Sequence, residues 1–264
     1  GRLGERAVIY HCVDNYAANP GADREAVERL ERRMLERADL VFATSRSLFE
    51  KCSALNGNTV YTPNVADSEH FSKVLSSPLE VPEELEALPP PRVGFVGNLA
   101  AYKVDIGMVA EAARRMPRVS FVFIGPVGAG DPATDPGPLL EAGNVALLGE
   151  KEYSELPAYL AGMDACMIPF RANETTRDVF PMKFFEYMAC GLPVVVTGLP
   201  ALAEYADYCY IAAGPGDFTV KLAAALAEDD PAARRERSAL AAANSWPGRM
   251  EELSRRIMEI AGTP

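Results

Sequence analysis

Short apolar runs alternate with amphipathic helical patterns along most of this 264-residue chain, and this alternation limits the fold more than any other feature of the sequence. The runs AVIYHCV (7–13), DLVFAT (39–44), VSFVFI (119–124) and PVVVT (193–197) are typical of buried strands. Strands that alternate with helices of about 10–15 residues form parallel sheets, which helices cover on both faces. The sequence therefore predicts an α/β protein.

The candidate strands fall into two groups along the chain. Residues 1–71 contain three of them, and residues 92–243 contain six together with their helices. Residues 72–91 are rich in Ser, Pro and Glu, which is typical of a linker, and residues 244–264 are expected to hold a last helix. Because a three-stranded parallel sheet is thin for an independent domain, we expect 1–71 to be the remaining part of an N-terminal domain and 92–243 to be complete.

The charge and the cysteine content exclude several classes of protein. The chain has 26 basic and 37 acidic residues, a net charge of −11, which disfavours binding to nucleic acid or to an anionic membrane surface. Its five cysteines indicate reduced, buried thiols, and its two histidines argue against a metal site. We therefore expect a cytoplasmic protein that binds neither nucleic acid nor a metal ion.

Residues 173–197 carry the clearest chemical signal. Pro181 fits the first turn of a helix and Gly191 fits the position just past its end. Glu186 lies inside this helix, and Asp178 precedes it by eight positions. Ligands of open parallel sheets bind beyond the C-terminal ends of the strands, where a helix N-terminus favours a phosphate.

The spacing alone leaves two other interpretations open. Glu186 can pair with Lys183 on a half-exposed helix. Asp178 can be a solvated loop carboxylate.

The same stretch resembles the signature of family-four glycosyltransferases of the GT-B fold, Glu-x7-Glu followed by an apolar helix and Gly-x-Pro-Val-Val. Here the pair is Asp178 and Glu186, and PMKFFEYMACGLPVV (181–195) is similar to the version of many bacterial sugar transferases. The resemblance implies a GT-B-like fold of two Rossmann-type parallel-sheet domains, of which the first is incomplete here.

The resemblance also implies roles for individual residues. Glu186 would accept hydrogen bonds from the ribose hydroxyls of a nucleotide sugar, because a carboxylate can take two hydroxyl donors. Asp178 would face the donor sugar and the reacting centre, where the family usually has the longer Glu. Lys183 would lie near the diphosphate or the ribose, and Val179 and Phe180 would line the same nucleotide-sugar site.

A second motif follows the strand at 93–96. Gly97 and Lys103 match a family segment whose lysine neutralises the diphosphate, so that Lys103 would help the leaving group depart. Asn98 replaces an arginine that is common in the family, and we expect Lys183 to substitute for the missing cation. An ordinary exposed loop lysine is the alternative interpretation of Lys103.

Three further segments support the alignment. Residues 144–160 resemble the family segment whose backbone receives the base, with Lys151 and Tyr153 nearby. Residues 62–71 resemble the Pro-Asn-Gly-Val-Asp…Phe segment that closes the N-terminal domain, and Ser245-Trp246 resembles the point where the chain returns to that domain.

The first region contains a weaker match. Family members often have His-Asp after the strand that corresponds to residues 7–13. Asp14 fits the Asp and is a candidate catalytic residue at the inter-domain cleft. Val13 occupies the place of the His, and His11 lies two positions earlier, so that His11 is expected to be a satisfied strand histidine.

The resemblance predicts a glycosyltransferase that moves a sugar from a UDP-, GDP- or dTDP-sugar to an acceptor hydroxyl with retention, in polysaccharide or glycoconjugate biosynthesis. No metal or cofactor is expected, and membrane contact is expected only if the acceptor is lipid-linked. The alternative is a non-catalytic nucleotide-sugar-binding module, or a fragment that needs a partner chain. Two histidines argue against a third possibility, a sugar-nucleotide epimerase. The donor base, the donor sugar and the acceptor stay open, and turnover by this chain alone is expected to be slow.

Overall fold

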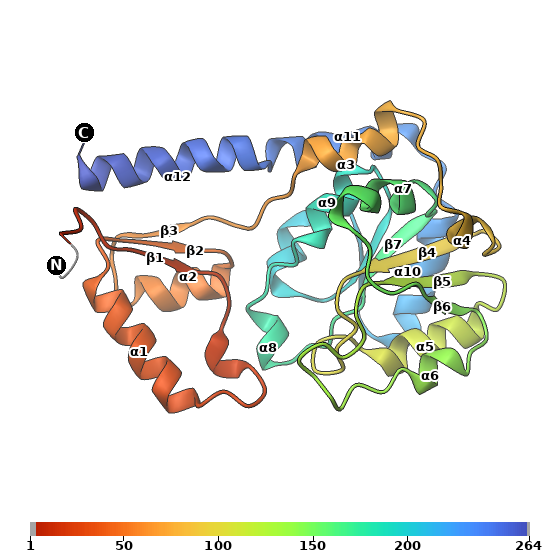
Figure 1. The fold of residues 1–264 in the computed structure, drawn as a ribbon, viewed down its shortest axis with the longest axis horizontal. Helices are drawn as coiled ribbons and strands as arrows, with labels where there is room; N and C mark the ends of the chain where they lie inside the picture. The colour runs from red at the N-terminus through yellow and green to blue at the C-terminus, as the bar shows by residue number, and fades with distance from the viewer. Residues whose placement is uncertain (1–3, 263–264) are drawn as a thin grey trace.

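The computed structural model describes residues 4–262, which form two parallel-sheet units side by side (Figure 1). The ends of the first and last predicted segments, 1–3 and 263–264, lie outside the described residues. The smaller unit has a three-stranded sheet in the order β1-β2-β3. Its elements are β1 (Ile9–Cys12), α1 (Arg24–Arg37), β2 (Leu40–Ala43), α2 (Arg46–Ser53) and β3 (Thr59–Tyr61), with a 3-10 turn at Tyr16–Ala18.

The larger unit has a six-stranded parallel sheet in the order β6-β5-β4-β7-β8-β9. Its strands are β4 (Arg92–Val96), β5 (Ser120–Ile124), β6 (Val145–Leu147), β7 (Ala165–Ile168), β8 (Val194–Thr197) and β9 (Tyr210–Ala212). The order reverses between β4 and β7, and doubly wound sheets bind their ligands at this reversal, beyond the carboxyl ends of the strands. The predicted α/β class and both parallel sheets are confirmed.

Several of the helices begin at a residue whose side chain caps the first turn. The Asp105 side chain accepts a hydrogen bond from the Met108 N–H at 3.1 Å, and Asp23, Asp67 and Asp230 cap helices in the same way. The remaining α-helices are α3 (Ser68–Ser76), α4 (Glu83–Glu86), α5 (Ile106–Arg115), α6 (Gly137–Leu140), α7 (Leu156–Ala161), α8 (Glu174–Arg177), α9 (Lys183–Ala189), α10 (Pro215–Leu226), α11 (Pro231–Ala243) and α12 (Trp246–Ala261). Short 3-10 turns lie at Tyr153–Glu155 and Pro200–Tyr205.

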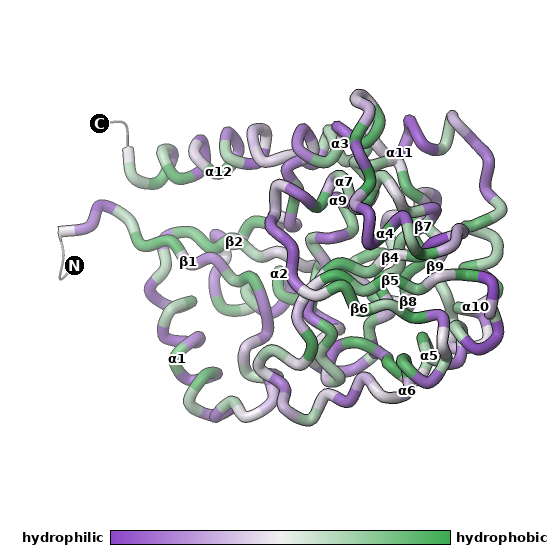
Figure 2. The backbone as a smooth tube through the Cα atoms, turned by 45° about the vertical axis from the view of Figure 1, so that its right-hand side comes forward, coloured by the Kyte–Doolittle hydropathy of each residue, from purple (hydrophilic) through white to green (hydrophobic). Residues whose placement is uncertain are grey.

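The main core lies in the larger unit. Strands β5, β7 and β8 are fully buried, β4 is buried after its first residue, and the outer strands β6 and β9 are partly buried. Figure 2 shows hydrophobic backbone gathered at β4, β5 and β6. Phe184, Phe185 and Tyr187 of α9 are fully buried, so this helix is fixed against the sheet on the side that carries the predicted site. None of the helices within residues 4–262 is long and apolar enough to cross a membrane.

The segment predicted as a linker packs onto the larger unit. Helix α3 contacts α7 and α9, and Phe71 is fully buried in the larger core. Leu85 of α4 is also fully buried there, beside Gly162. Residues 72–91 therefore include parts of two helices that cover one side of the larger sheet.

The chain passes between the units twice at one place. Ala66 on the first passage forms a parallel bridge with Ser245 on the second, and the Ala66 N–H donates to Asn244 O at 3.4 Å. Helix α12 then runs back over the smaller unit (Figure 1).

Candidate functional site

A cavity of about 590 Å³ lies between the two units. The smaller unit contributes residues that follow β1 and β3, and the larger unit contributes the loops after β4 and β7 together with the start of α9. Its lining includes His11, Asp14, Asn64, Gly97, Lys103, Val179, Phe180 and Lys183. The reversal point of the larger sheet therefore opens into this cleft.

The loop after β4 starts with a close approach of two backbones. Gly97 and Gly125 both have positive φ, +148° and +134°, and a Cβ on Gly125 would lie 2.3 Å from the Gly97 carbonyl oxygen. Only glycine fits this position without displacing the loop. The approach fixes the start of the loop that carries Lys103.

Lys103 and Asp14 face the cleft from opposite units. Burial lowers the pKa of Lys103, and the nearby Asp14 carboxylate opposes this effect. Burial raises the pKa of Asp14, and Lys103 opposes that in turn. The Lys103 ammonium lies 5.3 Å from the centroid of the Phe170 ring. Lys103 is therefore a half-buried cation in the cleft and not an ordinary exposed lysine.

Glu186 is a buried carboxylate next to the cleft. The residue is 6% exposed, and the Lys183 Nζ lies 2.7 Å from its Oε2. Burial raises the pKa of Glu186, while Lys183 and His70 act against this rise. The i,i+3 pair with Lys183 that the spacing allows is present, on a helix that is buried and not half-exposed. Glu186 itself lines neither cavity, so its role as a nucleotide-sugar contact stays a prediction.

Asp178 lies beside the cleft but does not line it. The residue is 4% exposed, and the Asn15 Nδ2 of the smaller unit donates a hydrogen bond to its Oδ2 at 2.8 Å. Arg177 lies 3.6 Å from its other oxygen. It is therefore not a solvated loop carboxylate, and it joins the two units. Thr175 Oγ1 also donates to the Ala18 carbonyl across the units, at 3.0 Å.

The side chain of Asn98 is used inside its own unit. Its Nδ2 donates to the Ala129 carbonyl at 2.7 Å, and its Oδ1 accepts from the Ala129 N–H at 3.1 Å. Both ends of the amide are therefore occupied in holding two loops together. This explains why an uncharged residue can stand where an arginine is common.

A second cavity of about 600 Å³ adjoins the cleft and shares Val96, Gly97 and Lys183 with it. Lys151 lines this second cavity, and its Nζ is paired with Glu84 of α4 at 2.6 Å. Tyr153 lies close by but is not among the lining residues; its ring stacks on His70 at 4.8 Å between centroids. The side chains of Lys151 and Tyr153 therefore fix the loop at 150–153 against α3 and α4.

Three site residues were not found from the sequence: His70, Asn15 and Asn64. The His70 Nε2 contacts the Tyr153 carbonyl at 3.0 Å, and its ring acts electrostatically on Glu186. The Asn64 Nδ2 donates to the Phe180 carbonyl at 3.0 Å. Asn64 and His70 both lie within residues 62–71, the segment that resembles the family's Pro-Asn-Gly-Val-Asp…Phe segment. That resemblance was the signal in the sequence that could have pointed to these two residues.

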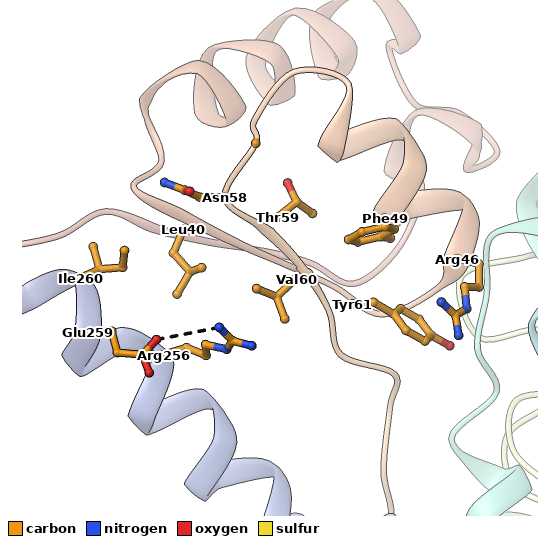
Figure 3. A pocket seen from close by; sticks show the side chains of 11 residues that line it. Leu40, Arg46, Phe49, Asn58, Thr59, Val60, Tyr61, Arg256, Glu259 and Ile260 are labelled. Carbon is orange, nitrogen blue, oxygen red and sulfur yellow. Dashed lines mark ion pairs between the residues drawn. The ribbon is translucent and has the colours of Figure 1, made fainter.

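A third cavity, of about 460 Å³, lies between β3 and α12 and shares no lining residue with the cleft. Leu40 and Val60 face Arg256 and Ile260 across it, and the Tyr61 ring lies against Arg46, whose guanidinium carbon is 4.3 Å from the ring centroid (Figure 3). Arg256 is paired with Glu259 at 3.8 Å. Within residues 4–262 no cluster of three or more His, Cys, Asp or Glu side chains could hold a metal ion.

Two parallel-sheet units that face each other across a ligand-sized cleft define the GT-B class of glycosyltransferases, and solved structures of that class share this fold. Anabaena HepE in complex with UDP superposes with a TM-score of 0.75 at 17% identity, over 95% of this chain and 72% of HepE. The UDP-forming α,α-trehalose-phosphate synthase of Burkholderia xenovorans gives a TM-score of 0.75 at 14% identity, over 99% of this chain and 70% of that one. The predicted fold is confirmed.

The chain belongs to the family described as glycosyl transferases group 1, which residues 90–228 match. It is also 28% identical over 274 aligned positions to TuaH of Bacillus subtilis (strain 168), a proposed teichuronic acid biosynthesis glycosyltransferase. That alignment covers 97% of this chain, which spans 66% of the length of TuaH. The family expected from Asp178, Glu186 and the following helix is thus confirmed.

Proposed function

We propose that this chain is the donor-binding part of a glycosyltransferase that moves a sugar from a nucleoside-diphosphate sugar to an acceptor hydroxyl. The observation that carries the proposal is the buried pair of Glu186 and Lys183, because Lys183 lines both adjoining cavities. Family membership and the UDP complex of HepE support it. UDP-sugars are therefore the first donors to test, before GDP- and dTDP-sugars.

Glu186 is the proposed ribose contact. A carboxylate accepts hydrogen bonds only, so an ionised Glu186 can take both ribose hydroxyls. Burial works against ionisation, and Lys183 opposes this by its charge and its hydrogen bond. The base would then enter the cavity beside the 150–153 loop, whose backbone is steadied by the Lys151–Glu84 and Tyr153–His70 contacts.

Lys103 and Lys183 are the proposed diphosphate contacts. Both line the cleft, as does Gly97. Charge develops on the leaving diphosphate as the bond to the sugar breaks, so two cations in a partly dry cleft stabilise the transition state more than the ground state. Burial in the cleft disfavours the charged form of Lys103. The negative charge of a bound diphosphate would offset this effect.

Asp14 and Asp178 are the proposed carboxylates of the reaction. Asp14 lies on the side of the smaller unit, and its raised pKa suits a group that takes a proton from an acceptor hydroxyl. Asp178, held by Asn15, would act on the donor sugar after a small movement of the two units. We infer retention of the anomeric configuration from the family pattern, and nuclear magnetic resonance of the product checks it.

Calorimetric titration of the chain with UDP, GDP and dTDP tests the proposal. We expect one nucleotide to bind and Glu186→Gln to weaken it by roughly tenfold to a hundredfold, because a buried carboxylate that accepts two hydroxyl hydrogen bonds is worth about 1.5–3 kcal/mol. Glu236→Gln, an exposed glutamate on α11, is the matched control. Equal affinity in wild type and Glu186→Gln would show that the ribose site is elsewhere.

The same samples separate the enzyme from a binding module. A transferase releases free nucleoside diphosphate from a UDP-sugar, even slowly and with water as acceptor, and Lys103→Met should reduce this release more than it reduces binding. Binding without any release in the presence of acceptors would instead support a non-catalytic module.

A further inference from the structure

One part of the cleft is not used by the proposed donor site. Trp246, the single tryptophan of the sequence, lines the cleft at the start of α12 and is 45% exposed. Met182 lines the same cleft and is 52% exposed. Within residues 4–262 no aromatic ring or cation stacks on the indole. A large apolar ring left open inside a cavity is characteristic of a binding surface.

Neutral hydrogen-bonding groups line the cleft together with this ring. Asn15, Asn19 and Asn64 come from the smaller unit and all line the cleft. Asn15 and Asn64 each donate a hydrogen bond from Nδ2 to the larger unit, which fixes their amides, and within residues 4–262 neither Oδ1 accepts a hydrogen bond. Amides donate and accept, so they match hydroxyl groups without requiring a charge on the ligand.

We propose that Trp246 and these asparagines form the acceptor subsite, and that the acceptor is a saccharide whose ring stacks on the indole. A pyranose has C–H groups on its ring face and hydroxyls around its edge, which matches an open aromatic ring and neutral amides that line one cavity. A hydrocarbon acceptor would leave the amides unused. A phosphorylated acceptor would need cations, and Lys103 and Lys183 already hold the donor diphosphate in the proposed function, on which this inference rests.

Intrinsic fluorescence tests the subsite directly, because the protein has one tryptophan. Glucose, N-acetylglucosamine and glucuronate are titrated with and without UDP while acrylamide quenches the emission. We expect at least one of these sugars to shield Trp246 from acrylamide. Sorbitol, which has the hydroxyls of glucose but no ring, should give no shielding.

Substitutions then connect the indole to turnover. Trp246→Ala should raise the KM for the shielding saccharide roughly tenfold with little change in kcat, and Trp246→Phe should restore part of the loss. Both variants should keep the UDP affinity measured by calorimetry.

The two proposals fail in different ways. If UDP binds but no sugar shields Trp246, or if sorbitol shields it equally, the saccharide subsite is wrong. If UDP does not bind, the donor proposal fails, and the sugar titration without UDP still decides the subsite.

Discussion

Removing the cation next to Glu186 should destabilise the protein in a way that depends on pH. In Lys183→Met the stem of the side chain is kept and the charge is lost. The pair is largely shielded from water, with side-chain exposures of 28% for Lys183 and 8% for Glu186, and the two atoms lie 2.7 Å apart. A buried carboxylate without its partner costs about 3–5 kcal/mol, and the partial exposure of Lys183 reduces this to about 1–3 kcal/mol.

The sign of the pH dependence follows from the pKa of Glu186. Burial already raises this pKa above its unfolded value, and loss of Lys183 raises it further. A group whose pKa is higher in the folded than in the unfolded protein stabilises the fold at pH values below the unfolded pKa. This stabilisation is lost as the pH rises through the folded pKa. The stability of Lys183→Met should therefore be close to that of wild type near pH 4.3, about the unfolded pKa of glutamate. Its loss of stability relative to wild type should be largest at about pH 8.

Urea unfolding of four proteins measures this effect: wild type, Lys183→Met, Glu186→Gln and the double variant. We expect the loss from Lys183→Met to grow with pH when Glu186 is present and to stay small and constant in the Glu186→Gln background. An equal loss at all pH values, or an equal loss in both backgrounds, would refute the electrostatic reasoning and would assign the effect to packing of the lysine stem.

Two further substitutions test the frame around the site. Gly125→Ala places a Cβ 2.3 Å from the Gly97 carbonyl oxygen at a φ of +134°. We expect thermal unfolding to show about 1–3 kcal/mol less stability, and we expect UDP binding to be weak. UDP binding as strong as in wild type would show that the two loops separate freely. Tyr187→Phe leaves the buried Val96 N–H, now 2.8 Å from the Tyr187 hydroxyl, without an acceptor. Urea unfolding should show about 1–3 kcal/mol less stability, and an unchanged midpoint would mean that water replaces the hydroxyl.

The parts of the fold that depend on local pattern were predictable. Buried strands, aspartate caps such as Asp23, and the proline and glycine at the ends of α9 all act over a few neighbouring residues. The pair of Glu186 and Lys183 is three residues apart on one helix, so spacing alone identified it. The family could be predicted from the sequence because the motif of α9 combines apolar residues with this one carboxylate.

The contacts that set the orientation of the site were not predictable, because they join residues distant in the sequence. Asn15 and Asp178 are 163 positions apart, and His70 and the Tyr153 carbonyl are 83 apart. Asn98 was predicted as a nucleotide-sugar contact at the position of a common arginine, and its contacts with Ala129 in another loop could not be read from that motif. No periodicity or local motif encodes such pairs, since they exist only after the sheets are assembled.

The two passages of the chain between the units have a mechanical consequence. They lie against each other at Ala66 and Ser245, so the units share one pivot instead of two separate tethers. The contacts of Asn15 with Asp178 and of Ala18 with Thr175 are made by other parts of both units. A small rotation about the pivot would therefore open these contacts, while the two covalent connections keep their local geometry. The two units would then move as rigid bodies about a single hinge.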